Sequence, residues 1–346
     1  MKKTYSIIGA MAGSSMDGLD LVCSIFYLKN DEWNYLIEKC DTIPYEEGLF
    51  AELKNSPSLS LEKQQALDIK FGKWISEKIN LFKSDLGFVD LLGVHGHTVI
   101  HEPHNGVSWQ LGDGQTIAAN CGIPTITDFR TLDIEHGGQG APLVPYGDFT
   151  LFGEYDICLN LGGISNISLK ANRIAWDICP CNQVLNFFSN QLGFPYDDGG
   201  ELATKGRYDK SFYELISSNA YFSAPPPKSL PNNFVDQVLL LTVEPSDGLH
   251  TYTHVIVDQI VKSLPKGIDS RMLITGGGAQ NTFLIELLTK SLDRCEVVVP
   301  DKKLIDFKES IVFAFLALKR FKNEINVLSS VTGASKDTSS GVIHLP

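Results

Sequence analysis

Runs rich in apolar residues, typical of β-strands, occupy much of the first forty residues. Strand-like runs cover residues 4–10, 19–28 and 33–43, and they follow one another closely enough to predict an antiparallel meander. The pattern changes to helical spacing between Leu59 and Phe82, where most apolar residues fall on one face. Short strand signals follow at 89–94 and 124–128. The order of these elements predicts an α/β domain.

The same opening pattern returns near residue 156. Residues 156–161 read as an apolar strand, Gly162 and Gly163 supply a turn, and residues 166–169 resume the strand pattern. A Gly- and Pro-rich stretch around Gly137–Gly140 precedes this second start. It predicts a junction between two domains, 1–135 and 136–346. Further predicted elements are helices near 182–192, 248–264 and 309–321 and strands at 271–275 and 295–299.

Composition and charge narrow the class of protein. The chain has 346 residues, of which 43% are hydrophobic and 20% charged, as in an ordinary globular protein. No apolar run is long enough to cross a bilayer and the start lacks a signal-peptide pattern, so we expect a cytoplasmic protein. The formal net charge of −12 argues against nucleic acid as the main partner. The seven cysteines are scattered, and we expect them to be reduced.

The turn between the first two strands is rich in glycine and serine. Its sequence from Gly9 to Val22 is GAMAGSSMDGLDLV. Successive backbone N–H groups in such a turn can hold an anion, and Asp17 lies where a phosphate-bound Mg²⁺ could reach it. The alternative is a plain hairpin in which Gly and Asp serve turn geometry alone.

Three glycine clusters in a fixed order favour nucleotide binding. The opening turn and the turn at Gly162-Gly163 each join two strands, and Gly276-Gly277-Gly278 lies at a strand-to-helix junction. Two such hairpins predict duplicated domains that face each other across a cleft and hold phosphates, with the third cluster holding the nucleoside. The alternative is that three Gly-rich turns are simply what a large α/β protein contains.

The polar run HGHTVIHEPH, residues 95–104, suggests a different class of function. Four histidines in this run, together with Cys179 and Cys181, could ligate a metal in a hydrolase. However, no Cys-x-x-Cys pair and no aspartate after His97 completes such a site. We therefore interpret the run as a substrate-facing loop.

Eight segments follow one another along the chain: GAMAGSSMDGLD, GVHGHTVIHEP, LGDGQTIAANCGIPTITDFRTLDIEHGGQGAPLVP, LNLGGISNIS, PYDDGGELATKG, ITGGGAQN, KESIVFAFLA and SVTGAS. In this order they resemble the 1,6-anhydro-N-acetylmuramic acid kinases, which belong to the superfamily of actin, sugar kinases and heat-shock ATPases. The resemblance covers nearly the whole chain. It implies a two-lobed actin-like α/β fold with duplicated ribonuclease-H-like domains, mixed sheets flanked by helices.

The resemblance also implies which residues bind ATP. The first phosphate hairpin corresponds to Gly13, Ser14, Ser15, Met16, Asp17, Gly18, Leu19 and Asp20. The second corresponds to Gly162, Gly163 and Asn166, and the nucleoside platform to Gly276, Gly277 and Gly278. Asp17 would hold Mg²⁺ through water. Ser14 stands where the family has Thr, which keeps a hydroxyl.

The family's catalytic aspartate lies in a segment written D-T-G-P-G-N, which matches residues 177–182, DICPCN. Asp177 thus resembles the base, while Ile178, Cys179 and Cys181 replace the family's Thr and two Gly. Arg130 and Glu309 resemble sugar-binding residues. His97 and Thr98 lie in the expected substrate loop, where His97 replaces Gln. Without the resemblance, Asp177 could be a helix cap, Arg130 an ion-pair partner and Glu309 a helix-dipole carboxylate.

The reaction that the resemblance implies uses ATP and Mg²⁺. Water opens the 1,6-anhydro ring of anhydro-N-acetylmuramic acid, and O6 is phosphorylated to give N-acetylmuramic acid 6-phosphate and ADP. The family also implies a homodimer. Two alternatives stay open: a catalytically weak or inactive nucleotide-binding sensor, because of the altered residues 178, 179 and 181, and a kinase for another amino sugar or hexose.

Overall fold

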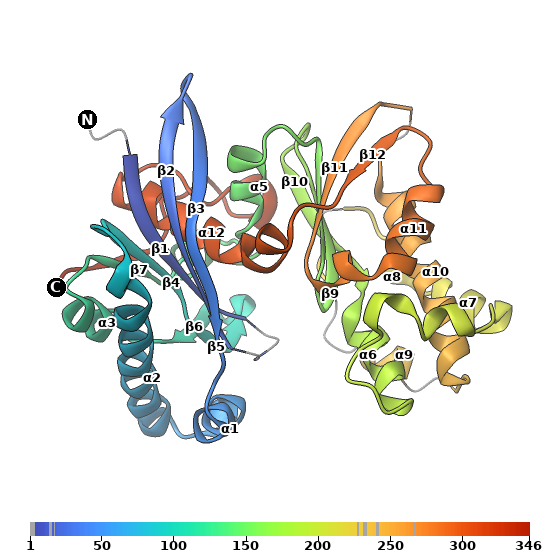
Figure 1. The fold of residues 1–346 in the computed structure, drawn as a ribbon, viewed down its shortest axis with the longest axis horizontal. Coiled ribbons are helices and arrows are strands. Elements are labelled where there is room, and N and C mark those ends of the chain that lie inside the picture. Colours follow the sequence, from blue (N-terminus) through green and yellow to red (C-terminus); the bar gives the residue numbers. More distant parts are fainter. Residues whose placement is uncertain are drawn as a thin grey trace. The chain divides into compact units, whose positions relative to one another are not determined.

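A computed structural model describes residues 4–13, 16, 18–226, 228–230, 234–239, 242–265 and 267–346 (Figure 1). The chain divides into two compact units. Unit 1 comprises Met1–Leu151 and Phe307–Pro346, and unit 2 comprises Phe152–Asp306. Among the described residues, no helix has both the length and the hydropathy to cross a membrane.

Unit 1 is built on a six-stranded mixed sheet with the order β13-β7-β4-β1-β2-β3. The first three strands form the predicted antiparallel meander, and β4 and β7 add to it in parallel. A separate hairpin, β5–β6, follows β4. The strands are β1 (Thr4–Ala12), β2 (Leu19–Lys29), β3 (Glu32–Ile43), β4 (Leu91–His95), β5 (His97–Glu102), β6 (Val107–Leu111), β7 (Thr125–Thr127) and β13 (Val342–His344).

Helices cover both faces of this sheet because alternate strand residues point in opposite directions. Ile8 and Ala10 share a core with Phe71 and Ile75 of α2. On the other face, Gly9 lies so close to α12 that an added Cβ would come within 1.9 Å of the Ser310 carbonyl oxygen. The helices of unit 1 are α1 (Glu47–Asn55), α2 (Leu61–Phe82), α3 (Gly114–Cys121), α4 (Thr131–Glu135), α5 (Pro145–Leu151), α12 (Lys302–Phe321, from Phe307) and α13 (Ser329–Thr332).

The packing of α12 explains why the units differ from the predicted division at residue 135. The late helix returns to the first sheet, where glycines of β1 and β4 lie against it, and Gly147 of α5 lies against Val312 of the same helix. The C-terminal segment and residues 136–151 consequently belong to unit 1. A contact between segments this far apart in sequence leaves no local pattern from which to predict it.

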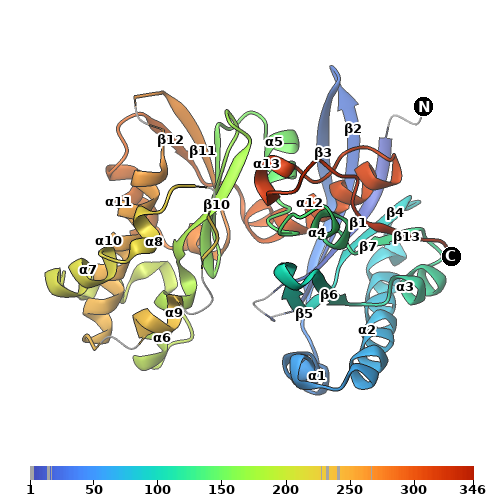
Figure 2. The same ribbon diagram turned by 180° about the vertical axis from the view of Figure 1, so that it is seen from behind.

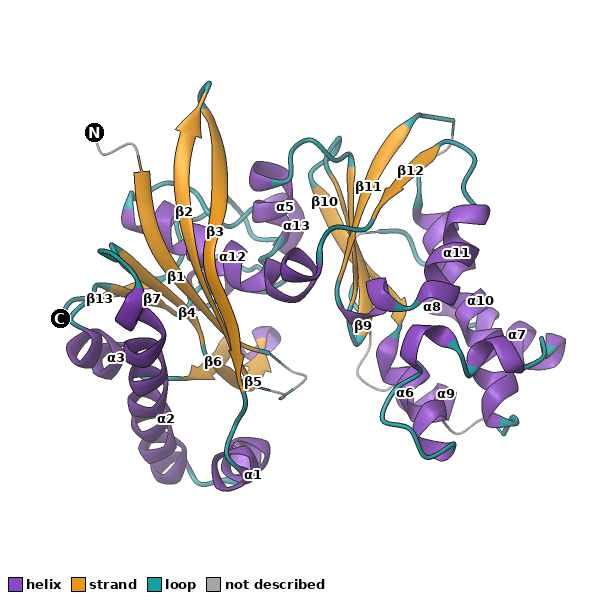
Figure 3. Cartoon of the chain, in the orientation of Figure 1, coloured by secondary structure: helices purple, strands orange, loops and turns teal. Residues whose placement is uncertain are grey.

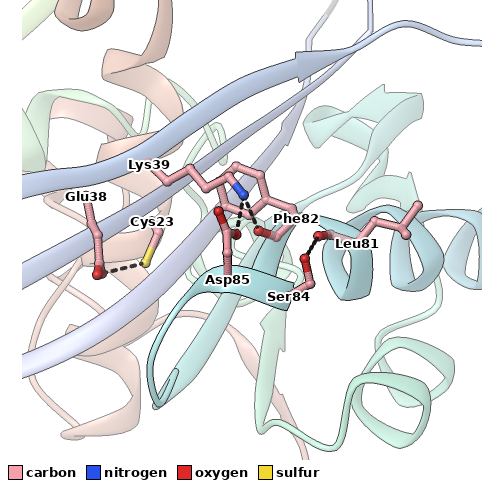
Figure 4. A network of polar contacts seen from close by, with 7 residues as sticks. All are labelled: Cys23, Glu38, Lys39, Leu81, Phe82, Ser84 and Asp85. Atoms are coloured by element: carbon pink, nitrogen blue, oxygen red, sulfur yellow. Dashed lines mark hydrogen bonds and ion pairs between the residues drawn. The ribbon is translucent and has the colours of Figure 1, made fainter.

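A polar contact fixes the end of α2 against β3 (Figure 4). The Lys39 ammonium donates to the Phe82 carbonyl oxygen at 2.8 Å and lies 2.5 Å from the Asp85 carboxylate. A cation at a helix C-terminus is favourable because the last carbonyl groups have no helical partner. Next to it, the thiol of Cys23 on β2 contacts Glu38 of β3.

Unit 2 repeats the architecture with a five-stranded sheet of order β10-β9-β8-β11-β12. Strands β8, β9 and β10 form a meander, while β11 and β12 add in parallel beyond β8. The strands are β8 (Ile157–Leu161), β9 (Ile164–Leu169), β10 (Ile174–Pro180), β11 (Ser270–Thr275) and β12 (Cys295–Val298).

The helices of unit 2 gather on one face of that sheet, as Figure 2 shows. They share one apolar core with it, which includes Phe188 of α6, Tyr252 of α10 and Leu284 of α11. The helices are α6 (Asn182–Gln191), α7 (Lys210–Ser217), α8 (Ala220–Ser223), α9 (Phe234–Leu239), α10 (Pro245–Ser263) and α11 (Thr282–Lys290).

The two sheets have the same connection order, which Figure 3 allows the reader to follow. In each unit a three-stranded meander is extended, beyond its first strand, by two parallel strands. Unit 1 differs by the extra antiparallel edge strand β13. This repetition confirms the predicted α/β fold of duplicated, ribonuclease-H-like mixed sheets flanked by helices.

Candidate active site

The first predicted phosphate hairpin is the β1–β2 turn of unit 1. Gly13 accepts a backbone hydrogen bond from Met16 at 3.2 Å, and β2 begins at Leu19. The Asp20 carboxylate accepts from the Thr42 hydroxyl at 2.6 Å, and Gly18 lies against the main chain of Ile43. Ser14, Ser15 and Asp17 lie outside the described residues. Their roles toward phosphate and Mg²⁺ therefore stay predictions.

The second predicted hairpin, the β8–β9 turn, is held against the start of α6. The Gly163 carbonyl oxygen accepts from the N–H groups of Cys181 and Gln183, at 2.8 and 3.2 Å. The Gly162 carbonyl oxygen accepts from Asn182 N–H at 3.1 Å. These bonds satisfy N–H groups that a helix start leaves without a helical partner. The turn is thus fixed in place by backbone groups.

The glycine platform meets this hairpin at the carboxyl ends of β8 and β11. An added Cβ on Gly276 would lie 2.6 Å from Asn160 Oδ1, and one on Gly278 would lie 2.7 Å from Leu161 Cβ. Asn182 Nδ2 donates to the Leu161 carbonyl oxygen at 3.0 Å. Unit 2 thereby brings together two of the three glycine clusters that the sequence connects with nucleotide binding.

Asp177 lies on β10 directly opposite Asn166 of β9, at a β-bulge. Its side chain is half-buried, and its carboxylate Oδ2 accepts from Leu230 N–H at 2.9 Å. Burial raises the pKa of this carboxyl above its usual value of 3.8, and the bond from Leu230 opposes that rise. A carboxylate with a raised pKa is suited to accepting a proton from water.

Within residues 177–182, the three that depart from the expected D-T-G-P-G-N segment are core residues. Ile178 is 2% exposed, and Cys179 and Cys181 are fully buried in the apolar core of unit 2. Ile178 is the extra residue of the bulge, between the paired positions 177 and 179. Burial raises the pKa of the Cys179 thiol to about 12, so the thiol is neutral at physiological pH. The replacements therefore lie in the apolar core of unit 2.

In unit 1, polar and charged side chains lie close to the buried Arg130. Its Nη2 donates to His95 Nε2 at 2.8 Å, and its Nη1 donates to the Gly140 carbonyl oxygen at 2.6 Å. Burial lowers the pKa of Arg130 to about 10, while Glu309 and Asp128 oppose this shift. Burial likewise raises the pKa of Glu309, opposed by the neighbouring charges of Lys308 and Arg130. The predicted sugar residues Arg130 and Glu309 thus lie near each other.

The polar run 95–104 is mostly strand, not the loop that the sequence suggested. His95 ends β4 and residues 97–102 form β5. His97 is 8% exposed and its ring lies near the Leu53 carbonyl group of α1, whereas Thr98 is exposed. In the described part of the chain, no three His, Cys, Asp or Glu side chains come together as a metal site.

A cavity of about 240 Å³ opens in unit 1 at the carboxyl ends of β4 and β7. Its wall includes His95 and Asp128, two neighbours of Arg130, together with Asp68, Trp109 and Gln110. Asp68 Oδ1 accepts from Gly112 N–H at 2.6 Å, and burial raises the pKa of Asp68 to about 6. An aromatic ring with amide and carboxylate groups is the kind of lining that binds a polar ring compound.

A family model described as anhydro-N-acetylmuramic acid kinase matches residues 5–346. The chain belongs to the anhydro-N-acetylmuramic acid kinase family. It is therefore a sugar kinase by family, of a class that uses ATP. The match extends over both units and includes every predicted site residue.

Among curated relatives, the anhydro-N-acetylmuramic acid kinase of Actinobacillus pleuropneumoniae serotype 3 is 32% identical, over 97% of this chain and 98% of the relative. That of Azorhizobium caulinodans is also 32% identical, over 98% and 99%. A solved structure, the activator of 2-hydroxyisocaproyl-CoA dehydratase from Clostridium difficile with bound ADPNP, has a TM-score of 0.42 and 14% identity, covering 93% of this chain and 96% of that one.

Several residues around the site were not predicted from sequence. His95 was seen only as one of a group of histidines, although its position at the end of a buried strand beside Gly96 is typical of an active-site edge. Tyr221, Lys228 and Leu230, which bond to Asp177, were not connected with it because they lie more than forty residues away in sequence. Only a fold-level pairing brings them together.

We predict that His95 makes stability fall in mild acid. Its Nε2 accepts from Arg130, so the ring must be neutral, and burial holds its pKa well below the usual 6.5. Protons then bind the unfolded state more readily than the folded one as the pH drops below 6.5. The free energy of unfolding should fall by at most about 1.4 kcal/mol per pH unit from this group.

Denaturant titrations between pH 7 and 5 measure this effect. His95→Gln keeps an acceptor for Arg130 but cannot titrate, so its curve should be flatter than that of the wild type. Identical slopes for the two proteins would contradict the assignment.

Proposed function

We propose that the chain is an ATP-dependent kinase that hydrolytically opens the 1,6-anhydro ring of anhydro-N-acetylmuramic acid and phosphorylates O6. The products are N-acetylmuramic acid 6-phosphate and ADP. Two observations support the proposal: the family match over residues 5–346, and the half-buried carboxylate of Asp177. The resemblance of residues 177–182 to the family's segment assigns this carboxylate as the base.

In this proposal Asp177 is the general base. Water attacks the anomeric carbon C1 while its proton passes to the Asp177 carboxylate, and the C1–O6 bond breaks. O6 then attacks the γ-phosphorus of ATP, and ADP leaves. Asp177 contributes by accepting a proton at a raised pKa, and the hydrogen bond from Leu230 fixes the carboxylate that does so.

Unit 1 supplies charge and shape for the sugar in this proposal. Arg130 is fixed at two points, His95 and the Gly140 carbonyl group, so its guanidinium is preorganised for a polar substituent of the sugar. Glu309 supplies an acceptor beside it. The cavity next to His95 offers polar groups for the remaining substituents.

Backbone groups of the two glycine hairpins and the platform would hold ATP, with the phosphates at the hairpins and the nucleoside at Gly276–Gly278. Asp17 would hold Mg²⁺ through water, since a carboxylate is a hard oxygen ligand of the kind that this ion prefers. When bound, Mg²⁺ neutralises charge on the phosphates. From the family we also propose a homodimer, which analytical ultracentrifugation tests.

We expect Arg130→Lys to raise the KM for the sugar. The substitution keeps the charge but cannot bond to His95 and Gly140 with one fixed planar group. Loss of a hydrogen bond to a charged group costs about 1.5–3 kcal/mol, or roughly ten- to a hundredfold in KM. Steady-state kinetics with both substrates measure this, and the KM for ATP should stay unchanged. A rise confined to ATP would contradict the sugar role.

A product assay tests the function itself. The purified protein is incubated with ATP, MgCl₂ and anhydro-N-acetylmuramic acid, and ADP and sugar phosphate are quantified. N-acetylglucosamine and glucose serve as alternative acceptors. Turnover that requires the anhydro sugar supports the proposal. Tight ATP binding without turnover would favour the nucleotide-binding sensor, and turnover on another sugar would favour the second kinase alternative.

A further inference from the structure

The edge strand β10 is bordered at Asp177 by the segment 221–230, of which Pro227 lies outside the described residues. Three hydrogen bonds join the two. Asp177 N–H donates to the Lys228 carbonyl oxygen at 3.0 Å, and Leu230 N–H donates to Asp177 Oδ2 at 2.9 Å. The Tyr221 hydroxyl donates to the Asp177 carbonyl oxygen at 2.6 Å. The segment 221–230 therefore bonds to both backbone groups of Asp177 and to its carboxylate.

The position of Asp177 explains why such bonds matter. Strand β10 is at the edge of its sheet, where outward N–H and C=O groups have no strand partner. The register also shifts between residues 177 and 179, and a bulge bends the strand and re-aims side chains. The sheet alone consequently fixes Asp177 less firmly than an interior residue. The segment 221–230 supplies the missing constraint from outside.

The segment itself is anchored through Tyr221. The Lys228 ammonium donates to the Tyr221 carbonyl oxygen at 2.8 Å and lies 4.4 Å from the centre of the Tyr221 ring. The ring contacts those of Phe222 and Phe234, and Phe234 is 2% exposed. Tyr221 thus connects an aromatic cluster at one end to the backbone of Asp177 at the other.

We infer that Tyr221 is a positioning residue for the Asp177 base, acting through the segment 221–230 and the Leu230 amide. With Oδ2 held by Leu230, the carboxylate presents Oδ1 to the attacking water. The inference rests on the proposed function, in which Asp177 is the base. The new element is that the segment 221–230, more than forty residues away in sequence, orients this base.

The titratable groups around Asp177 decide what a pH profile will show. Among the described residues, these groups include Tyr221 and Lys228 of the segment and Cys179 on β10 itself. Tyr252 of α10 lies further along β10, where it bonds to the Pro180 carbonyl group. Burial raises the pKa values of Cys179 and of both tyrosines, so these groups are neutral near pH 7. The Leu230 N–H bond favours the charged form of Asp177, and its loss raises the pKa of Asp177 further.

Tyr221→Phe tests the inference, with Tyr213→Phe as the matched control. Tyr213 lies in the same unit and also donates its hydroxyl hydrogen bond, to the Asp258 carboxylate. In Tyr221→Phe the kcat should fall about five- to tenfold, the loss of one hydrogen bond. The KM for ATP should stay unchanged, and the acid limb of the kcat profile should move to higher pH. Tyr213→Phe should match the wild type in all three.

Further variants distinguish a failure of this inference from a failure of the proposed function. Lys228→Met should lower kcat in the same direction as Tyr221→Phe, and the double variant should lose less than the product of the two effects, because both act through one segment. A Tyr221→Phe enzyme with wild-type kcat and acid limb would overturn the inference, as would equal losses in Tyr213→Phe. If Asp177→Asn itself keeps normal turnover, the proposed function fails instead, whatever Tyr221→Phe does.

Discussion

Replacement of Asp177 by Asn is expected to lower kcat by about 10²–10⁴-fold, the usual contribution of a general base. The amide has nearly the same shape and can still accept from Leu230 N–H, so the β10 backbone and the segment 221–230 should keep their positions. Only the ability to take a proton from water is lost. ATP binding, measured by calorimetry, should be unchanged, since the glycine clusters are untouched.

The matched control is Asp293→Asn, which makes the same chemical change at an exposed position of unit 2. It should leave kcat and ATP affinity at wild-type values. Near-normal turnover in Asp177→Asn would remove Asp177 from the role of base. A loss of ATP binding in the same variant would show that the substitution disturbs the nucleotide groups as well.

The second large effect is expected for Gly276→Ala. Gly276 has a φ of 81°, a backbone conformation that residues with a side chain rarely adopt. An added Cβ would lie 2.6 Å from Asn160 Oδ1. Strained backbone of this kind costs of order 1–3 kcal/mol. The turn therefore relaxes away from β8, and the Kd for ATP should rise by about ten- to a hundredfold, at 1.4 kcal/mol per tenfold.

Gly277→Ala is the control that the chain itself offers. An added Cβ on Gly277 meets only Asn182 Nδ2, at an ordinary 3.6 Å. Calorimetric titration with ATP should therefore distinguish two neighbouring glycines that look alike in sequence. Equal affinity in the two variants would mean that the conformation of Gly276 does not matter for the nucleoside platform.

Much of the fold could be predicted from the sequence because its signals are local. The apolar runs of β1, β2 and β8 and the glycine turns between strands depend on neighbours in the chain. The repeated strand–turn–strand pattern predicted the duplication, which the shared strand order confirms. The helix expected at 309–321 is the later part of α12, which begins at Lys302.

The features that could not be predicted depend on distant segments. Strand β10, which carries Asp177, has a bulge and an irregular mixture of apolar and polar residues. Its sequence therefore does not show a regular strand pattern. The return of α12 to the first sheet depends on close packing of Gly9 and Gly93 against it. The polar run 95–104 looked like a loop because β4 ends and β5 begins in buried histidines, where polarity does not indicate exposure.

In the candidate site, too, some residues were predicted from sequence motifs and others became visible only in the structure. Motif resemblance proposed Asp177, Arg130 and Glu309 as site residues. The structure places Arg130 near Glu309, with His95 as its hydrogen-bond partner. It also showed that His97 lies against α1, so a direct sugar contact from this side chain stays only a prediction. The partners that orient Asp177 came from geometry alone.

In the proposed reaction, this chain adds water across the anhydro ring and phosphorylates O6 in one turnover. The most direct test is turnover of the anhydro sugar with ATP and MgCl₂ in H₂¹⁸O, with rapid quenching and mass spectrometry of the sugar phosphate. Unlabelled product exposed to H₂¹⁸O for the same time corrects for exchange. We expect one ¹⁸O atom in the sugar, none in the phosphoryl group, and one ADP for each sugar phosphate. A sugar phosphate that lacks the label or keeps the anhydro ring would rule out this reaction.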